Sequence, residues 1–267
     1  MKTRIISGFA LIPLIALVFL GGWWLAALCL VVALIGVKEF FDGCGAMDVH
    51  PSLPLAYGLI LLLYVANGFW PNQHTLLLGW VALSVILCSL VMFDIERRTP
   101  IDAAMTLIGL VYIAFFTFHL VLIDQTGEFS IMKWMAVITA CATDTFAYFA
   151  GVFLGRHKLC PTLSPKKTIE GAIGGIIGSV LCSAIFAHFL CREYFWSCVI
   201  IGLVASPVSM CGDLTASAYK RKMGIKDYGN LIPGHGGVMD RFDSILFTAP
   251  FVYYYIVIVM QHFGLLF

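Results

Sequence analysis

The sequence predicts an all-α polytopic membrane protein, and three observations support this fold class. Of its 267 residues, 61% are hydrophobic and only 12% are charged, whereas soluble domains carry about 25% charged residues. Apolar runs long enough to cross a bilayer, which takes about 20 residues in a helix, recur from one end of the chain to the other. Lys and Arg gather in alternate connections between these runs, as expected for connections that stay in the cytoplasm.

The apolar runs predict about nine transmembrane helices. The first two are joined only by Gly21 and Gly22, but a single helix from Ile5 to Val37 would be roughly 50 Å long, against a hydrocarbon core of about 30 Å. Two short spans are therefore expected, the first a retained anchor because no small-residue cleavage site follows it. The predicted spans are 5–20, 23–41, 53–70, 75–93, 102–123, 132–154, 170–190, 195–218 and 241–261.

The distribution of basic residues predicts the orientation of these spans. With the N-terminus inside, all but Lys133 and Arg192 of the 16 Lys and Arg residues fall in cytoplasmic segments. This is the asymmetry that the positive-inside rule describes. Nine spans then place the N-terminus in the cytoplasm and the C-terminus outside it.

The polar connections divide one predicted membrane domain, residues 1–267, into two unlike parts. Residues 1–130 have short, plain loops and are expected to form mainly scaffold helices. Residues 131–267 contain the two long polar connections, 155–169 and 219–240, which are both basic and both predicted to be cytoplasmic. This second part is the predicted catalytic half.

Four carboxylates lie within or at the ends of the last spans. A carboxylate in the middle of a transmembrane helix costs roughly 2.5–3.5 kcal/mol on insertion scales, so it calls for a partner or a polar cavity. Asp213 and Ser217 share a helix face at a spacing of four, and Asp240 and Asp243 share one at a spacing of three. Each acid alone could be neutralised by a nearby Lys or Arg, but four of them, including Asp144, favour a shared chemical role.

The two basic connections offer sites for anions. Ser164 and Pro165 are predicted to begin a helix as its N-cap and first residue, which would place Lys166 and Lys167 in the first turn, where backbone N–H groups favour an anion. The second connection contains the glycine-rich "PGHGG", whose backbone could approach a phosphate closely. It carries Lys220, Arg221, Lys222 and Lys226. The alternative is that these cations only anchor the chain beside anionic lipid.

Carboxylates and cations on one side of a membrane fit a site for a divalent metal and phosphates. Phosphoryl and nucleotidyl transfer depend on metal ions, cations and alignment more than on covalent chemistry by the protein. Mg²⁺ binds oxygen ligands and commonly uses few carboxylates, with water and substrate phosphate completing its shell. The combination therefore predicts a phosphate-transfer site at the cytoplasmic surface.

The stretch "SAYKRKMGIKDYGNLIPGHGGVMDRFD", residues 217–243, resembles the signature of the phosphatidate cytidylyltransferases, also called CDP-diacylglycerol synthases. The segments "DTFAYFAGVFLGRHKL", "LSPKKTIEG" and "CGDLTASAYKR" also look like that family, so the resemblance covers roughly residues 130–267. It implies that CTP and phosphatidate react to give CDP-diacylglycerol and pyrophosphate. No general base is required, because the attacking phosphate oxygen is already an anion.

The resemblance also implies roles for individual residues. Mg²⁺ is the expected cofactor, and a second cation is left open. Asp213, Asp240 and Asp243 would bind the metal, with Asp144 as a further ligand or a second-sphere acid, and Lys226 would join the three aspartates as a catalytic residue. The residues expected to bind the substrates are Lys166, Lys167, Ser217, Lys220, Arg221, His235, Gly236, Gly237 and Arg241.

Two other functions stay open at this point. A CTP-dependent lipid kinase of the polyprenol or phytol type has a similar C-terminal region, but would transfer the γ-phosphoryl group to an alcohol. An ion-coupled transporter would use Asp144 and Asp213 midway across the membrane, although transporters commonly show repeats and broken helices in both halves.

The expected partners are CTP, phosphatidate and membrane lipids, with no nucleic acid. The expected location is a bacterial plasma (inner) membrane, with the active site facing the cytoplasm. The motifs Gly171-x-x-x-Gly175 and Gly174-x-x-x-Gly178 are typical of close helix packing. An internal contact is favoured for them, and a homodimer is the alternative.

Overall fold

A computed structural model describes residues 13–71, 74–231 and 236–262 of the chain. The described residues are mostly helical, and their only strands form one two-stranded hairpin. The predicted all-α class is therefore confirmed, with this hairpin as a local exception. The main helices are α2 (Gly22–Gly45), α3 (Leu53–Phe69), α4 (His74–Leu90), α5 (Pro100–Gly109), α6 (Phe116–Asp124), α7 (Lys133–Leu154), α8 (Ile169–Leu190), α9 (Phe195–Met223) and α10 (Met239–Tyr255).

Short 3₁₀ or π-helical stretches extend or connect these helices. The π-helical stretch η2 (Leu110–Phe115) joins α5 to α6, so that Pro100–Asp124 forms one continuous span. A second π-helical stretch, η5 (Ile256–His262), continues α10. The three 3₁₀ stretches are η1 (Val91–Phe93), η3 (Gly127–Met132) and η4 (Arg192–Tyr194).

Seven helices of the described part are long and apolar enough to cross a membrane. The 17-residue helix α3 is apolar but shorter, and it corresponds to the predicted span 53–70. Eight of the nine predicted spans thus coincide with apolar helices, while residues 5–12 of the predicted span 5–20 lie outside the described residues. The chain is a multi-pass membrane protein.

The predicted break between the first two spans is confirmed in the described residues. Gly21 and Gly22 both have positive φ values, 65° and 53°, which side chains with a Cβ atom rarely adopt. The Asp124 carboxylate accepts a hydrogen bond from the Gly22 backbone N–H, with an N···O distance of 2.5 Å. A carboxylate at this position satisfies one of the unpaired N–H groups at the start of α2.

The chain forms two compact units. The first unit comprises the described residues up to Gln125 together with 220–242, and the second comprises 126–219 and 243–262. The boundary at residue 125 lies near the predicted change at residue 130. The return of 220–242 to the first unit has no counterpart in the predicted division.

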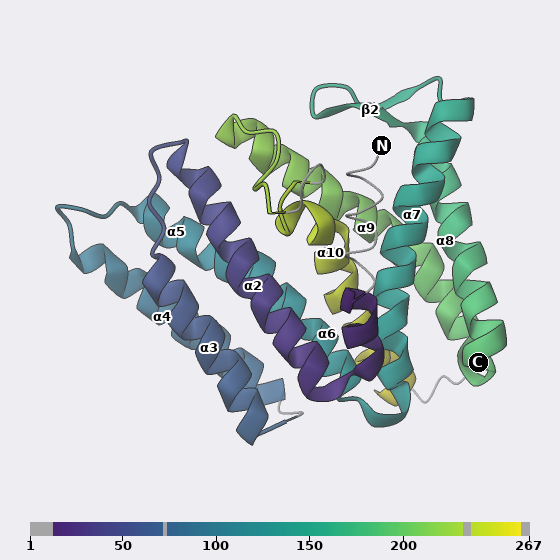
Figure 1. The fold of residues 1–267 in the computed structure, drawn as a ribbon, viewed down its shortest axis with the longest axis horizontal. Helices are drawn as coiled ribbons and strands as arrows, with labels where there is room; N and C mark the ends of the chain where they lie inside the picture. Colours follow the sequence, from purple (N-terminus) through teal and green to yellow (C-terminus); the bar gives the residue numbers. More distant parts are fainter. Residues whose placement is uncertain (1–12, 72–73, 232–235, 263–267) are drawn as a thin grey trace. The chain divides into compact units, whose positions relative to one another are not determined.

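The core of the first unit forms around α2. This helix packs against α3, α5, η2 and α6, and α3 packs in turn against α4 (Figure 1). Phe40 on α2, Ile113 on η2 and Phe118 on α6 are at most 1% exposed. The same side of α2 contacts the 220–242 segment, since the ring of Phe40 lies 6.2 Å from that of Tyr228.

In the second unit, α7 and α8 pack side by side along their length (Figure 1). The glycines of α8 make this approach possible. A Cβ atom on Gly174 would overlap the Ala150 side chain, and one on Gly178 would overlap the ring of Phe146. These glycines therefore serve an internal helix contact, as favoured from the sequence.

The start of α8 differs from the prediction. Ser164 does not cap a helix, because Ser164–Thr168 forms strand β2, which pairs in antiparallel fashion with β1 (Lys158–Cys160). The N-cap is Thr168, whose hydroxyl group accepts a hydrogen bond from the Gly171 N–H at 3.1 Å. Lys166 and Lys167 therefore lie on a hairpin strand before the helix, and not in its first turn.

The helices beside the second basic connection are also longer than predicted. α9 continues to Met223, so Lys220, Arg221 and Lys222 lie in its last turn and not in a loop. Cations there complement the helix dipole. Gly224, with a φ of 69°, follows the helix, and α10 begins at Met239. The predicted loop 219–240 is therefore limited to residues 224–238.

Candidate functional site

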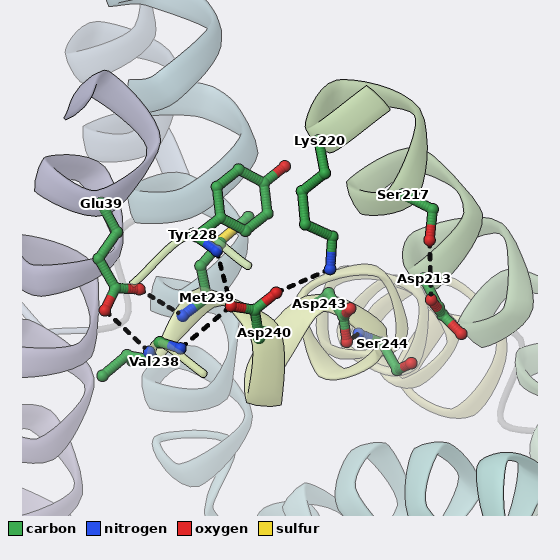
Figure 2. Close-up of polar contacts among 11 residues, drawn as sticks. Glu39, Asp213, Ser217, Lys220, Tyr228, Val238, Met239, Asp240, Asp243 and Ser244 are labelled. Atoms are coloured by element: carbon green, nitrogen blue, oxygen red, sulfur yellow. Dashed lines mark hydrogen bonds and ion pairs between the residues drawn. The ribbon is translucent and has the colours of Figure 1, made fainter. Parts of the chain in front are cut away.

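Asp240 organises the connection between α9 and α10 in the first unit. Its Oδ2 atom accepts hydrogen bonds from the backbone N–H groups of Tyr228, at 2.8 Å, and Gly237, at 3.0 Å (Figure 2). Its Oδ1 atom accepts a hydrogen bond from Lys220 Nζ at 2.7 Å. Both oxygens therefore already have donors from the protein, and the carboxylate holds the two ends of residues 228–237 together.

Lys220 is held in a defined position by this carboxylate. Its side chain is 16% exposed and that of Asp240 is 3% exposed. The ammonium group also lies 5.4 Å from the centre of the Tyr228 ring, within the range of a cation–π interaction. The predicted phosphate-binding lysine is thus fixed by two residues of the same connection.

Glu39 on α2 contacts this connection from the N-terminal part of the chain. Its Oε1 atom accepts a hydrogen bond from the Val238 N–H at 3.0 Å, and its Oε2 atom accepts one from the Met239 N–H at 2.9 Å (Figure 2). Glu39 is not among the predicted site residues, because the sequence predicts mainly scaffold helices for residues 1–130. An acid within an apolar run was the available signal.

The second unit contains a separate pair of opposite charges. Lys167 Nζ on the hairpin lies 2.5 Å from Asp213 Oδ2 on α9, and both side chains are less than a third exposed. Ser217, one turn further along α9, donates a hydrogen bond to Asp213 Oδ1 at 3.4 Å (Figure 2). The predicted shared face of Asp213 and Ser217 is confirmed.

Ser244 connects two more of the predicted carboxylates in the second unit. Its backbone N–H donates to Asp243 Oδ1 at 2.8 Å, and its hydroxyl group donates to Asp144 Oδ2 at 3.2 Å. Asp243 is 9% exposed. Gly212 on α9 lies directly against the Asp243 backbone, because an added Cβ atom would lie 2.6 Å from its carbonyl oxygen. The sequence did not predict the role of Ser244.

A cavity of about 490 Å³ lies in the second unit beside these acids. This volume is within the usual range of roughly 300–1,000 Å³ for small-molecule sites. Both cations and carboxylates line it, together with apolar residues of α7 and α8. The charged lining residues are Asp144, Lys158, Lys166, Lys167 and Asp213.

The other predicted site residues include four exposed cations, two glycines and one residue outside the described part. Lys166, Arg221, Lys226 and Arg241 are exposed, and Gly236 has a φ of 84°. Gly237 is buried, with its N–H on Asp240. His235 lies outside the described residues.

The carboxylates supply the oxygen ligands that Mg²⁺ prefers, but the described residues do not form a complete metal site by themselves. Within the described residues, no group of three or more His, Cys, Asp or Glu side chains is close enough to hold a metal ion. Mg²⁺ usually keeps several waters and shares its shell with substrate phosphates. The residues present therefore fit an ion that one or two carboxylates bind together with a nucleotide.

Comparison with known proteins agrees with the chemistry of these residues. The model of the cytidylyltransferase family matches residues 2–259. The phosphatidate cytidylyltransferase of Synechocystis sp. is 32% identical over 288 residues, covering 96% of this chain and 97% of that protein. The enzymes of that name from Staphylococcus saprophyticus and Staphylococcus aureus are 33% and 34% identical, each over 94% of this chain and 96% of their own length. The chain belongs to the cytidylyltransferase family.

Proposed function

We propose that this protein is a phosphatidate cytidylyltransferase, which converts CTP and phosphatidate to CDP-diacylglycerol and pyrophosphate. The family match and the names of relatives that align over nearly the whole chain support this activity. The membrane-spanning helices agree with a lipid substrate.

The reaction needs charge neutralisation and alignment more than a general base. An anionic oxygen of the phosphatidate phosphate attacks the α-phosphorus of CTP and forms a new P–O bond. The bond from the α-phosphorus to the oxygen bridging it to the β-phosphorus breaks, and pyrophosphate leaves with that electron pair. Cations offset the charge that develops on the leaving group.

Two lysine–aspartate pairs are the structural observation that supports the proposal most. Lys167 pairs with Asp213 in the second unit, and Lys220 pairs with Asp240 in the first. In each pair, the lysine is a predicted phosphate ligand and the aspartate a predicted metal ligand. Each pair therefore offers a cation that would bind a substrate phosphate and a carboxylate that would bind a metal ion.

The remaining cations and small residues complete the proposed substrate contacts. Lys166 lines the cavity and is proposed to bind phosphate. Lys226 and Arg241 are proposed to act on the triphosphate or the lipid phosphate, with Lys226 as the catalytic cation. The other proposed substrate-binding residues are Ser217, Arg221, His235, Gly236 and Gly237.

We assign the metal ligands to the carboxylates. Asp213 and Asp243 would hold Mg²⁺, with Asp144 as a further ligand or an acid behind them. Asp240, in the first unit, is the other proposed metal ligand, and its oxygens accept hydrogen bonds from Lys220 and two backbone N–H groups. When bound, the ion would neutralise phosphate oxygens.

The orientation and location form a further part of the proposal. The distribution of Lys and Arg supports a cytoplasmic N-terminus, nine spans and an extracytoplasmic C-terminus. The proposed site then faces the cytoplasm, where CTP is available, in a bacterial plasma membrane. The glycines of α8 lend no support to a homodimer, because they pack against α7.

The experiment supplies the purified protein with phosphatidate and with CTP labelled at either the α- or the γ-phosphorus. The proposal predicts α-label in the lipid and γ-label in pyrophosphate. Transfer of γ-label to a lipid alcohol would instead show a lipid kinase. Ion transport without any transfer of label would favour the transporter.

A further inference from the structure

Glu39 is a buried acid in a membrane-spanning helix. None of the metal-binding or substrate-binding roles proposed above involves it. It is 8% exposed and lies on α2, within the part of the chain expected to be scaffold. A buried carboxylate is costly unless its oxygens accept hydrogen bonds. Each oxygen of Glu39 does so, from backbone N–H groups about 200 positions further along the chain, and both residues belong to the first unit.

These N–H groups belong to the start of α10. Met239 is the first residue of that helix and Val238 immediately precedes it. The first N–H groups of a helix lack acceptors within the helix, and the positive end of its dipole favours an anion. Glu39 therefore acts as an N-terminal cap supplied by a different helix.

Two glycines, one near each end of the connection between α9 and α10, allow its backbone to approach Glu39 closely. A Cβ atom on Gly229 would lie 2.5 Å from Glu39 Oε1, and one on Gly237 would overlap Glu39 Oε2. Either residue could be alanine only if the carboxylate moved. The contact is thus specific in shape as well as in hydrogen bonding.

The residue after the capped pair is Asp240, which binds Lys220 and the N–H groups of Tyr228 and Gly237. Glu39 and Asp240 together hold the connection at successive positions, 238, 239 and 240. A shift in the first turn of α10 would move Asp240, and with it the carboxylate that holds the Lys220 ammonium group. We infer that Glu39 is a positioning residue that fixes the first turn of α10 and thereby the Asp240–Lys220 pair for nucleotidyl transfer, a role that rests on the proposed function.

The test compares Glu39→Gln with the wild type and with Asp42→Asn. Gln keeps the size of Glu, but its NH₂ group would face one of the two backbone N–H groups and cannot accept a hydrogen bond from it. Asp42 is a matched control because it lies on the same helix and pairs with Lys38 at an exposed position, 2.6 Å away. The readouts are hydrogen–deuterium exchange of a peptide covering residues 236–242, and kcat and KM for CTP.

Glu39→Gln should speed amide exchange in this peptide at least about tenfold, since charge-assisted hydrogen bonds are lost. It should lower kcat about 10- to 100-fold with a smaller change in KM, when rates are compared per folded protein. Asp42→Asn should leave both readouts within about twofold of wild type. A purely structural role would lower thermal stability without lowering kcat of the folded fraction.

A second set of variants tests the contact by shape. Gly229→Ala should lower kcat in the wild type but much less in Glu39→Asp, because the shorter side chain makes room for the added methyl group. Independent effects of the two substitutions would overturn the contact. Unchanged exchange in Glu39→Gln would overturn the cap, and unchanged kcat would overturn the positioning role. If the wild type makes no CDP-diacylglycerol, the proposed function is overturned. The hydrogen–deuterium exchange of residues 236–242 would still show whether Glu39 caps α10.

Discussion

The ammonium group of Lys220 lies 2.7 Å from the carboxylate of Asp240, in a pair whose side chains are 16% and 3% exposed. The Lys167–Asp213 pair repeats this arrangement in the second unit at 2.5 Å. Removing one partner of such a shielded pair leaves an uncompensated charge, which is costlier than removing both. This asymmetry makes both pairs accessible to double-mutant cycles.

We predict strong coupling between Lys220 and Asp240. Lys220→Met and Asp240→Asn should each lower the thermal midpoint in detergent, and the double variant should lose clearly less than the sum, a coupling of about 1–3 kcal/mol. The exposed pair Lys38–Asp42, at 54% and 59% exposure, is the matched control. Its coupling should stay below about 1 kcal/mol. Additive losses at Lys220 and Asp240 would contradict the pairing.

Lys222 and Lys226 should respond differently to substitution. Both are exposed, but only Lys226 occupies a position of the family signature, while Lys222 reads as a membrane-surface anchor. Lys222→Ala should keep activity within a few-fold of wild type, and Lys226→Ala should raise KM for CTP or lower kcat much more. Initial rates against CTP concentration measure this difference. Equal effects of the two substitutions would remove the special role of Lys226.

The packing of α7 against α8 predicts that alanine is not tolerated at Gly178 on α8, in contrast to a glycine on a helix without such a contact. Gly178→Ala would place a methyl group in direct overlap with the Phe146 side chain and should destabilise the protein by about 1–3 kcal/mol. Gly79→Ala on α4 has no heavy atom within 4 Å of the added Cβ and should be neutral or stabilising. Thermal unfolding of the two variants in one detergent provides the comparison. A fully stable Gly178→Ala variant would contradict the close approach of α7 and α8.

The proposed topology predicts the behaviour of reporter fusions. A reporter after residue 267 should be extracytoplasmic, and reporters inserted near residues 160 and 230 should be cytoplasmic, because nearly all Lys and Arg would then lie inside. Paired reporters that are active on opposite sides of the membrane check this directly. A cytoplasmic C-terminus would require an even number of spans.

The sequence predicted the spans well because apolar length is what a bilayer requires. It placed the end of α9 too early, since Lys220–Lys222 end the apolar run although the helix continues through them. It missed the hairpin because Ser164–Thr168 is short and polar and resembles a helix start with Pro165.

The residue types of the candidate site were also predictable, but their pairing was not. The signature identified Lys220 and Asp240, and the segment "CGDLTASAYKR" identified Asp213. Only the structure matches Lys167 to Asp213 and Lys220 to Asp240. Glu39 was missed because its partners, Val238 and Met239, lie 199 and 200 positions away and contribute only backbone N–H groups. Backbone donors leave no trace in a single sequence.

The most direct test of the proposed site measures initial rates of Asp213→Asn, Asp243→Asn and the double variant against CTP and Mg²⁺ concentrations. Asn keeps the shape of Asp but removes the charge that binds the ion, and it should insert in the membrane at least as well. We predict that each single variant loses most of its turnover and that the double variant loses little more, because both residues would serve one ion. Near-normal rates and Mg²⁺ dependence in both single variants, at matched thermal stability, would contradict the proposed metal site.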